Sequence, residues 1–152
     1  MGKKVKGRKR HVIVDTEGLL LHVLVHSAGI QDRDAAPLVF EGAEPKMSRV
    51  AVVWADQSYN SKKLRQWVDE RYTSKGRWRL EIKERPWRTT KLSGLTGFVV
   101  LQRRWVVERT FAWLYKYRRL SKDYEFLPRS SEAFIYLASS HLLLRRLCAS
   151  TT

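Results

Sequence analysis

Two short apolar runs near the start of the chain, at residues 11–14 and 19–26, constrain the fold more than any other feature of the sequence. Both are rich in β-branched and aliphatic residues, which favour strands. Between them stands Asp15-Thr16-Glu17-Gly18, with glycine where a tight turn needs a positive φ. The pattern predicts an antiparallel β-hairpin, on which the remaining elements must build.

The rest of the chain alternates between helical and strand-like patterns. We predict strands at 49–54, buried on both faces, and at 78–84, where Trp78, Leu80 and Ile82 share one side. Helices are predicted at 35–40 with Asp32 or Asp34 as the N-cap, at 61–72, at 99–119, and from Ser131 to Arg146, with a loop at 86–97. Because strands joined through helices run parallel, the order indicates an α/β fold with a mixed sheet.

The charge of the chain points to a polyanionic partner. The 152 residues include 30 Lys and Arg against 15 Asp and Glu, a formal net charge of +15, yet 43% are hydrophobic and six are Trp. That composition excludes a disordered basic tail and fits one domain at 11–152 behind a basic arm at 1–10. Residues 62–122 hold eighteen of the basic residues and five acidic ones, so we expect nucleic acid to bind there.

Cysteine content and hydropathy bear on the compartment. The single cysteine, Cys148, can form neither an internal disulfide nor a metal cluster, which favours a reducing cytoplasm. No segment has the pattern of a signal peptide, and the apolar run at 133–144 is interrupted and too short for a bilayer. We therefore expect a cytoplasmic protein without a membrane partner.

Asp56 is the first candidate site residue. It follows the predicted strand at 49–54, and the carboxyl ends of strands are where open α/β sheets place their ligands. The simpler interpretation is that Asp56 begins a turn and caps the helix that starts near Ser61. The residues alone leave both interpretations open.

Glu108 is the second candidate, because it is the only acidic residue between Glu84 and Asp123. Arg104 lies four residues earlier on the same helical face, so the simpler interpretation is a surface ion pair worth roughly a few tenths of a kcal/mol. The alternative places Glu108 and Asp56 around divalent cations. Phosphodiester chemistry uses two such ions, and hard Mg²⁺ is bound by carboxylate oxygens.

Other chemistries have weaker support. His22 and His26 share a strand face but stand roughly 13 Å apart, which is too far for a compact zinc site. The remaining histidines fit surface or core-edge positions, and no glycine-rich phosphate loop is present. Trp78 and Trp87 lie in the basic stretch, where a tryptophan can stack on bases. The other tryptophans considered fit the core: Trp54, Trp67, Trp105 and Trp113.

The sequence resembles bacterial insertion-sequence transposases of the DDE class, and the similarity runs essentially end to end. The blocks that resemble the family are residues 2–16, 54–56, 103–114 and 117–120. The third block is the most specific, because the family has a tyrosine, two residues, an arginine, three residues and then the catalytic glutamate. Arg104 and Glu108 match that spacing, whereas Leu101 replaces the tyrosine.

The resemblance implies an RNase H-like core, in which two aspartates and one glutamate hold two Mg²⁺ ions, or Mn²⁺ in their place. These ions serve DNA cleavage and strand transfer by a 3′-hydroxyl. Asp56 would be the second aspartate and Glu108 the glutamate. The residues that would contact DNA are Arg103, Arg104, Arg109, Lys116, Arg118 and Arg119, with Lys116 one residue out of the family's spacing for its basic residue.

The resemblance also implies a first aspartate, on a strand before the hairpin. Asp15 does not replace it, because Asp15 lies in the hairpin turn. We therefore expect the carboxyl-terminal part of a transposase, without the first strand and inactive in cleavage by itself. Its origin as a frameshift partner or as a remnant stays open. The expected partners are the DNA ends of the insertion sequence and further protein in the nucleoid: a second copy, the upstream-frame product or a full-length transposase.

Two other functions stay open. The charge alone favours a non-enzymatic DNA-binding fragment that modulates a full-length transposase. A basic ribosomal-type RNA binder also fits the charge, but it leaves the spacing of Arg104 and Glu108 unexplained.

Overall fold

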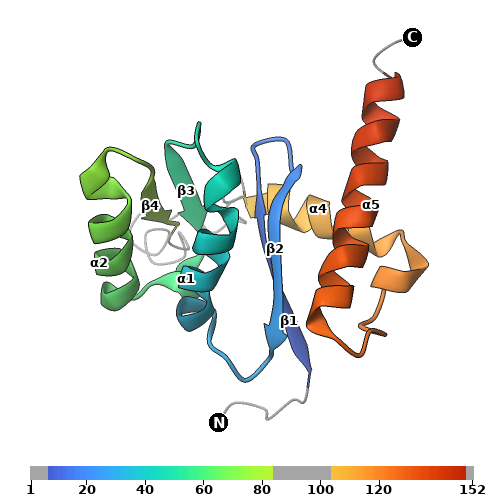
Figure 1. The fold of residues 1–152 in the computed structure, drawn as a ribbon, viewed down its shortest axis with the longest axis horizontal. Coiled ribbons are helices and arrows are strands. Elements are labelled where there is room, and N and C mark those ends of the chain that lie inside the picture. Colours follow the sequence, from blue (N-terminus) through green and yellow to red (C-terminus); the bar gives the residue numbers. More distant parts are fainter. Residues whose placement is uncertain (1–6, 84–103, 150–152) are drawn as a thin grey trace, which may run out of the picture.

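The computed structural model describes residues 7–83 and 104–149 (Figure 1). It is a mixed α/β structure, as the sequence predicts, whereas the predicted loop at 86–97 lies outside the described residues. Short 3₁₀ turns connect several of the elements. The strands and helices are β1 (Arg8–Val14), β2 (Leu20–Ser27), α1 (Asp32–Ala43), β3 (Val52–Ala55), α2 (Lys62–Arg71), β4 (Arg79–Ile82), α4 (Arg104–Tyr115) and α5 (Pro128–Ala149).

The predicted hairpin is confirmed, since β1 and β2 pair antiparallel. β1 begins at Arg8, three residues before the predicted strand. In the turn, the Asp15 carboxylate accepts hydrogen bonds from the backbone N–H groups of Glu17 (2.9 Å) and Leu19 (2.8 Å). Gly18 has a φ of 82°, a left-handed conformation that glycine adopts without strain. Local chemistry therefore determines this turn.

The second pair of strands is parallel. Val52 of β3 lies opposite Arg79 of β4, and α2 belongs to the connection between the strands, so the predicted mixture of strand directions is confirmed. β3 is shorter than the predicted strand at 49–54, and its residues are half-buried instead of buried on both faces. Within the described residues the two pairs form separate two-stranded sheets, so each strand leaves one edge without a strand partner.

The hairpin lies between two apolar clusters, with α1 to one side and α4 and α5 to the other (Figure 1). Ile13 of β1 packs against the first cluster and its neighbour Val12 against the second, because successive side chains of a strand point to opposite faces. The first cluster consists of Ala36, Phe40, Ala43, Met47, Leu64, Val68, Tyr72 and Trp78. The second consists of Val23, Val25, Leu114, Leu120, Ile135 and Ala138.

Two predicted helix starts are wrong. Neither Asp32 nor Asp34 is the N-cap of α1, because Gln31 holds that position and both aspartates lie in the first turn, where the helix dipole favours negative charge. α5 begins at Pro128 instead of Ser131, since proline has a helical φ and is favoured at a first helical position.

The other helix ends follow the sequence more closely. Ser61 caps α2 by accepting a hydrogen bond from the backbone N–H of Leu64, as the predicted start near Ser61 requires. α4 ends at Tyr115, four residues before the predicted end, and its predicted first residues at 99–103 lie outside the described residues.

Two tryptophans lie where they were not predicted. Trp78 is only 2% exposed and stacks on Tyr72 with ring centroids 4.4 Å apart, so the prediction of a base-stacking role for Trp78 is wrong. Trp105 is 48% exposed and not part of the core. Trp87 lies outside the described part of the chain. For Trp78, packing against Tyr72 therefore outweighs the basic residues that neighbour it in the sequence.

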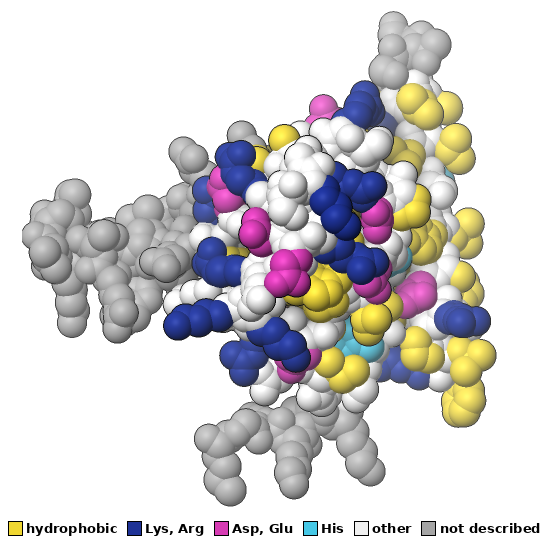
Figure 2. All heavy atoms as spheres, turned by 60° about the vertical axis from the view of Figure 1, so that its left-hand side comes forward, with side chains coloured by type: hydrophobic (Ala, Val, Ile, Leu, Met, Phe, Trp, Pro, Cys, Tyr) yellow, Lys and Arg dark blue, Asp and Glu magenta, His cyan; other side chains and the backbone are white. Residues whose placement is uncertain are grey.

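On the face shown in Figure 2, Lys and Arg side chains are interspersed with Asp and Glu and do not form one continuous patch. Hydrophobic side chains follow one edge of the same view, along α5, whose exposed leucines include Leu137, Leu144 and Leu147. No helix among the described residues is long and apolar enough to span a membrane.

Candidate active site

Asp56 directly follows β3 and is exposed. Its Oδ1 accepts two hydrogen bonds from Ser58, one from the backbone N–H (2.8 Å) and one from the hydroxyl (2.5 Å). Asp56 therefore caps the short 3₁₀ turn Gln57–Tyr59 and does not cap α2, whose N-cap is Ser61. The predicted position at the carboxyl end of a strand is confirmed, and the two hydrogen bonds orient the carboxylate.

A half-buried tyrosine, Tyr59, connects the turn after Asp56 to the hairpin. The Tyr59 hydroxyl lies 2.5 Å from Nδ1 of His11 in β1, and the His11 ring stacks on His26 with centroids 4.7 Å apart. Burial raises the pKa of Tyr59, and the carboxylates of Asp32 and Asp56 raise it further. Burial and the neighbouring His26 lower the pKa of His11, so His11 is neutral at pH 7 and accepts the hydrogen bond that Tyr59 donates.

Glu108 is exposed on the second turn of α4. Arg104 is the first residue of that helix, so its backbone stands one turn before Glu108, as the spacing predicts. Arg103 and the side chain of Arg104 lie outside the described part of the chain. An ion pair between Arg104 and Glu108 therefore stays a prediction.

Arg109 docks α4 onto the hairpin. Its Nη2 donates a hydrogen bond to the backbone carbonyl of Glu17 at 2.7 Å. The guanidinium also lies over two rings of its own helix, 4.4 Å from the centroid of Trp105 and 4.8 Å from that of Trp113. Arg109 thus has a structural role that the sequence did not indicate, and its contact with DNA stays a prediction.

Thr110 makes the second contact between α4 and the hairpin turn. It is 2% exposed, and its hydroxyl lies 2.7 Å from the carbonyl oxygen of Gly18 and 3.0 Å from that of Val106. Because Glu108 stands on the same helix, Arg109 and Thr110 together fix the position of the Glu108 backbone relative to the hairpin. The sequence gives no signal for this contact, which joins residues 92 positions apart.

The other predicted DNA contacts lie just after α4. Lys116 and Arg118 are exposed there. Arg119 is paired, because its Nε donates a hydrogen bond to Glu125 at 2.7 Å and its guanidinium lies 4.8 Å from the ring centroid of Phe134 in α5. The hydrogen bond to the Glu125 carboxylate raises the pKa of Arg119. This arrangement leaves Lys116 and Arg118 accessible to an anion.

Among residues 7–83 and 104–149, no group of three or more His, Cys, Asp and Glu side chains could hold a metal ion. Asp56 and Glu108 are exposed carboxylates on distant elements, and carboxylate oxygens are the ligands that Mg²⁺ takes.

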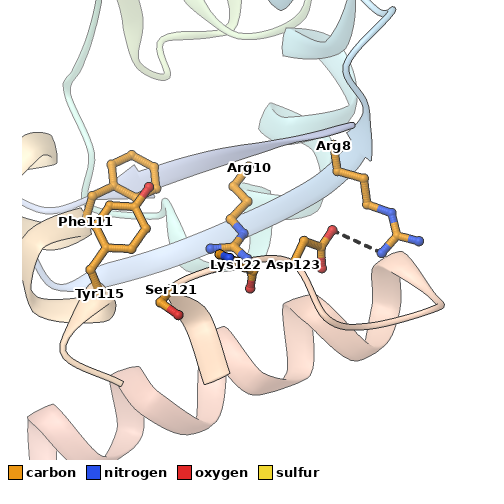
Figure 3. Close-up of a pocket in the computed structure, with 7 residues that line it drawn as sticks. All are labelled: Arg8, Arg10, Phe111, Tyr115, Ser121, Lys122 and Asp123. Carbon is orange, nitrogen blue, oxygen red and sulfur yellow. Dashed lines mark hydrogen bonds and ion pairs between the residues drawn. The ribbon is translucent and has the colours of Figure 1, made fainter. Parts of the chain in front are cut away.

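A cavity of about 330 Å³ lies between β1 and the carboxyl-terminal end of α4 (Figure 3). Sequence analysis missed it. The four-residue spacing of Phe111 and Tyr115 could have indicated an aromatic face on α4. Nothing in the sequence places β1 beside that face, because the contact joins residues more than 100 positions apart. The cavity is lined by Arg8, Arg10, Phe111, Tyr115, Ser121, Lys122 and Asp123.

Comparison with known proteins identifies the family of this α/β chain. A family model described as the transposase DDE domain matches residues 1–143. A candidate transposase of the insertion sequence element IS402 from Burkholderia cepacia is 32% identical over an alignment of 138 positions, and the match covers 86% of this chain. The chain therefore belongs to the transposase DDE domain family, and its resemblance to insertion-sequence transposases is confirmed.

The match covers only part of the relative, and it has no counterpart among solved structures. The chain spans 60% of the length of the Burkholderia relative that it matches. No solved structure matches the chain at a significant level.

Proposed function

We propose that this chain is the catalytic portion of a transposase, which cleaves DNA and transfers a 3′-hydroxyl strand end during transposition of an insertion sequence. The match of residues 1–143 to the transposase DDE domain is the observation that carries this proposal. The net charge of +15 supports DNA as the partner, because phosphates attract basic proteins whatever their sequence. In this proposal the DNA partner is the ends of the element, and the protein is located at the bacterial nucleoid. The proposed DNA contacts are Arg103, Arg104, Arg109, Lys116, Arg118 and Arg119.

In this proposal Asp56 and Glu108 are ligands of two Mg²⁺ ions, or of Mn²⁺. The residues fit such ions, because hard carboxylate oxygens are exposed at both positions. Ser58 holds Oδ1 of Asp56 with two hydrogen bonds, which orients the carboxylate as outer hydrogen bonds orient metal ligands. When bound, the ions would activate the attacking oxygen and stabilise the leaving oxygen of the phosphodiester.

The proposal includes a further strand between β1 and β3 that carries a third carboxylate. Both strands have an edge without a strand partner among the described residues, and the His11–Tyr59 hydrogen bond brings β1 close to the end of β3. A strand added there would join the two sheets into one RNase H-like mixed sheet. In this proposal Asp56 and Glu108 supply two of the three carboxylates and the added strand supplies the third, so we expect no cleavage by the 152-residue chain alone.

The test uses the chain joined to the rest of its transposase, labelled DNA with the terminal repeats of the element, and Mg²⁺. We expect Asp56→Asn and Glu108→Gln each to reduce nicking to background. Both residues are exposed, and Asn and Gln keep the size of the side chains and an oxygen that can accept hydrogen bonds, so we expect the fold to stay intact. Asp69→Asn, at an exposed carboxylate of α2, is the matched control and keeps activity. Nicking that persists in Asp56→Asn or Glu108→Gln overturns the assignment, and robust nicking by the 152-residue chain alone overturns the requirement for a third carboxylate.

The second candidate function is a DNA-binding fragment that modulates a full-length transposase, and the high net charge favours it. In that case the chain binds DNA and changes the activity of an added full-length transposase, whereas the joined protein does not cleave. Both candidates include assembly with a second copy or with the full-length protein. The exposed leucines of α5 support such assembly, which sedimentation with and without DNA would measure.

A further inference from the structure

The cavity between β1 and α4 combines positive charge with an exposed aromatic ring. Arg8 and Arg10 stand two residues apart on β1 and therefore project to the same face of the hairpin. Phe111 and Tyr115 approach that face from α4, and Lys122 completes the lining from the segment that follows (Figure 3). The cavity has a volume of about 330 Å³ and is open to solvent.

Among the described residues that line the cavity, Asp123 has the only carboxylate, and it is already paired. Asp123 pairs with Arg8 at 3.2 Å and accepts a hydrogen bond from the Ser131 hydroxyl at 2.5 Å. Arg8 also donates to the backbone carbonyls of Glu125 (2.7 Å) and Phe126. The charges of Arg8 and Asp123 therefore offset each other, and the cavity keeps a net positive charge from Arg10 and Lys122. Such a cavity attracts an anion.

Two hydrogen bonds to backbone carbonyls orient the Arg10 guanidinium. Its Nη1 donates to the carbonyl of Leu120 at 2.9 Å and its Nη2 to that of Lys122 at 3.2 Å. A guanidinium has five N–H groups, so these two bonds fix its orientation and leave further donors for a phosphate. Because the side chain is already ordered, binding costs little conformational entropy.

The aromatic part of the cavity has the geometry of a stacking platform. The rings of Phe111 and Tyr115 are nearly parallel, with an angle of 27° between their planes and centroids 6.3 Å apart. Tyr115 is 55% exposed, so its ring is accessible to a base. An exposed ring beside a fixed cation is how proteins bind single-stranded nucleic acid, with the base on the ring and the phosphate on the cation.

We propose that this cavity binds one unpaired nucleotide of the DNA substrate, with its base stacked on Tyr115 and its phosphate at Arg10 and Lys122. The inference rests on the proposed function, and it names a contact close to the reacting strand. Tyr115 stands seven residues after Glu108, on the same face of α4 and about 10 Å farther along the helix axis. That distance equals the axial rise of about three nucleotides in B-form DNA. The bound nucleotide would therefore lie within a few positions of a phosphate at Glu108.

The test measures binding by the 152-residue chain, with no cleavage step. The probe is a strand of twelve thymidines with one central 2-aminopurine, whose fluorescence falls when it stacks on an aromatic ring. We expect Tyr115→Ala to weaken binding of this strand by roughly 5- to 150-fold, as loss of one base–aromatic stack predicts, and to abolish the quenching. Tyr115→Trp restores both. Lys122→Gln weakens binding and leaves the remaining quenching at saturation unchanged.

Two controls separate stacking from a structural role. Tyr124→Ala removes a ring that is 59% exposed nearby but does not line the cavity, and we expect wild-type binding and quenching. The fully paired duplex of the same strand offers no unpaired base, so Tyr115→Ala should affect its binding much less. Equal losses for duplex and single strand, or equal effects of Tyr115→Ala and Tyr124→Ala, overturn the proposal.

Failure of this proposal is distinct from failure of the proposed function. If Asp56→Asn and Glu108→Gln abolish nicking while Tyr115→Ala binds the single strand normally, the nucleotide site is wrong and the transposase assignment stands. If Tyr115→Ala loses the stacked base while Asp56→Asn still nicks, the site stands and the metal-ligand assignment is wrong.

Discussion

Replacing Gly18 with alanine should weaken the contact between the hairpin turn and α4. Gly18 has a φ of 82°, and a side chain in this left-handed conformation costs about 1–2 kcal/mol. A Cβ built on Gly18 would stand 2.9 Å from the Thr110 hydroxyl oxygen and 3.2 Å from Cζ3 of Trp113. Thr110 is buried and hydrogen-bonded to the Gly18 carbonyl, so it moves away only by losing a bond worth about 1 kcal/mol. We expect a total loss of about 2–3 kcal/mol in the free energy of unfolding.

Gly76→Ala is the matched control for this substitution. Gly76 has a φ of 69°, but no atom of residues 7–83 or 104–149 lies within 4 Å of the position of its Cβ. The Gly76→Ala variant should therefore lose only the free energy of backbone strain, about 1–2 kcal/mol. We expect its free energy of unfolding to be about 1 kcal/mol higher than that of Gly18→Ala. Urea unfolding followed by circular dichroism measures both variants, with the midpoints compared at equal slope.

A double variant tests the cause of the difference. If the Thr110 side chain opposes the new Cβ, Gly18→Ala combined with Thr110→Ala should cost about 1 kcal/mol less than the sum of the single variants. Equal stabilities of Gly18→Ala and Gly76→Ala, together with additive effects in the double variant, would refute the proposed packing of α4 on the turn.

Two further predictions concern acid and salt. Burial acts to raise the pKa of Asp123, but the Ser131 hydroxyl and the charges of Arg8 and Arg10 outweigh it and lower the pKa below the ordinary value. The ionised carboxylate therefore stabilises the fold at neutral pH, and this contribution is lost as the pH falls below about 4. We expect Asp123→Asn to have a lower free energy of unfolding than the wild type at pH 7. Between about pH 5 and 3, the free energy measured by urea unfolding should fall less for Asp123→Asn than for the wild type. Binding of duplex DNA should weaken by at least roughly 10³-fold between 50 and 200 mM salt if six or more phosphates are contacted; a flat response in fluorescence anisotropy contradicts a DNA partner.

The sequence predicted those features that neighbouring residues determine. The turn after β1 forms because Asp15 and Gly18 supply its hydrogen bonds and its positive φ within five residues. Ser61 caps α2 for the same local reason. The position of Asp56 after β3 also followed from the sequence, because a short run of apolar residues ends there.

Features that depend on distant contacts were missed or wrongly placed. Trp78 lies in a basic stretch of sequence but is buried, because Tyr72 and Phe40 pack against its ring. The cavity at Tyr115 lies where Arg10 of β1 binds carbonyls of the segment after α4, and no local pattern predicts such a pairing. Pro128 is a local signal for the start of α5, because proline is favoured at the first helical position, and the predicted start at Ser131 did not take it into account.

The two edges of the hairpin differ, and the difference bears on where the sheet can grow. On the β2 edge, the backbone N–H of Val25 donates to the Glu132 carboxylate at 2.8 Å, and that of Val23 to the Tyr136 hydroxyl at 3.3 Å. These side chains of α5 occupy donors that another strand would need.

The β1 edge has the matching geometry without such a cover from α5. Val12 and Arg10 lie opposite Val23 and Val25. In an antiparallel pair, two opposite residues that do not hydrogen-bond to each other point their backbone N–H and C=O groups away from each other, toward the two outer edges. Because Val23 and Val25 point these groups to the β2 edge, Val12 and Arg10 point theirs to the β1 edge. A new strand can therefore pair with the hairpin on the side of β1, which the His11–Tyr59 hydrogen bond joins to the end of β3. The same side chains of α5 that block one edge thus favour the addition of the proposed carboxylate-bearing strand beside Asp56.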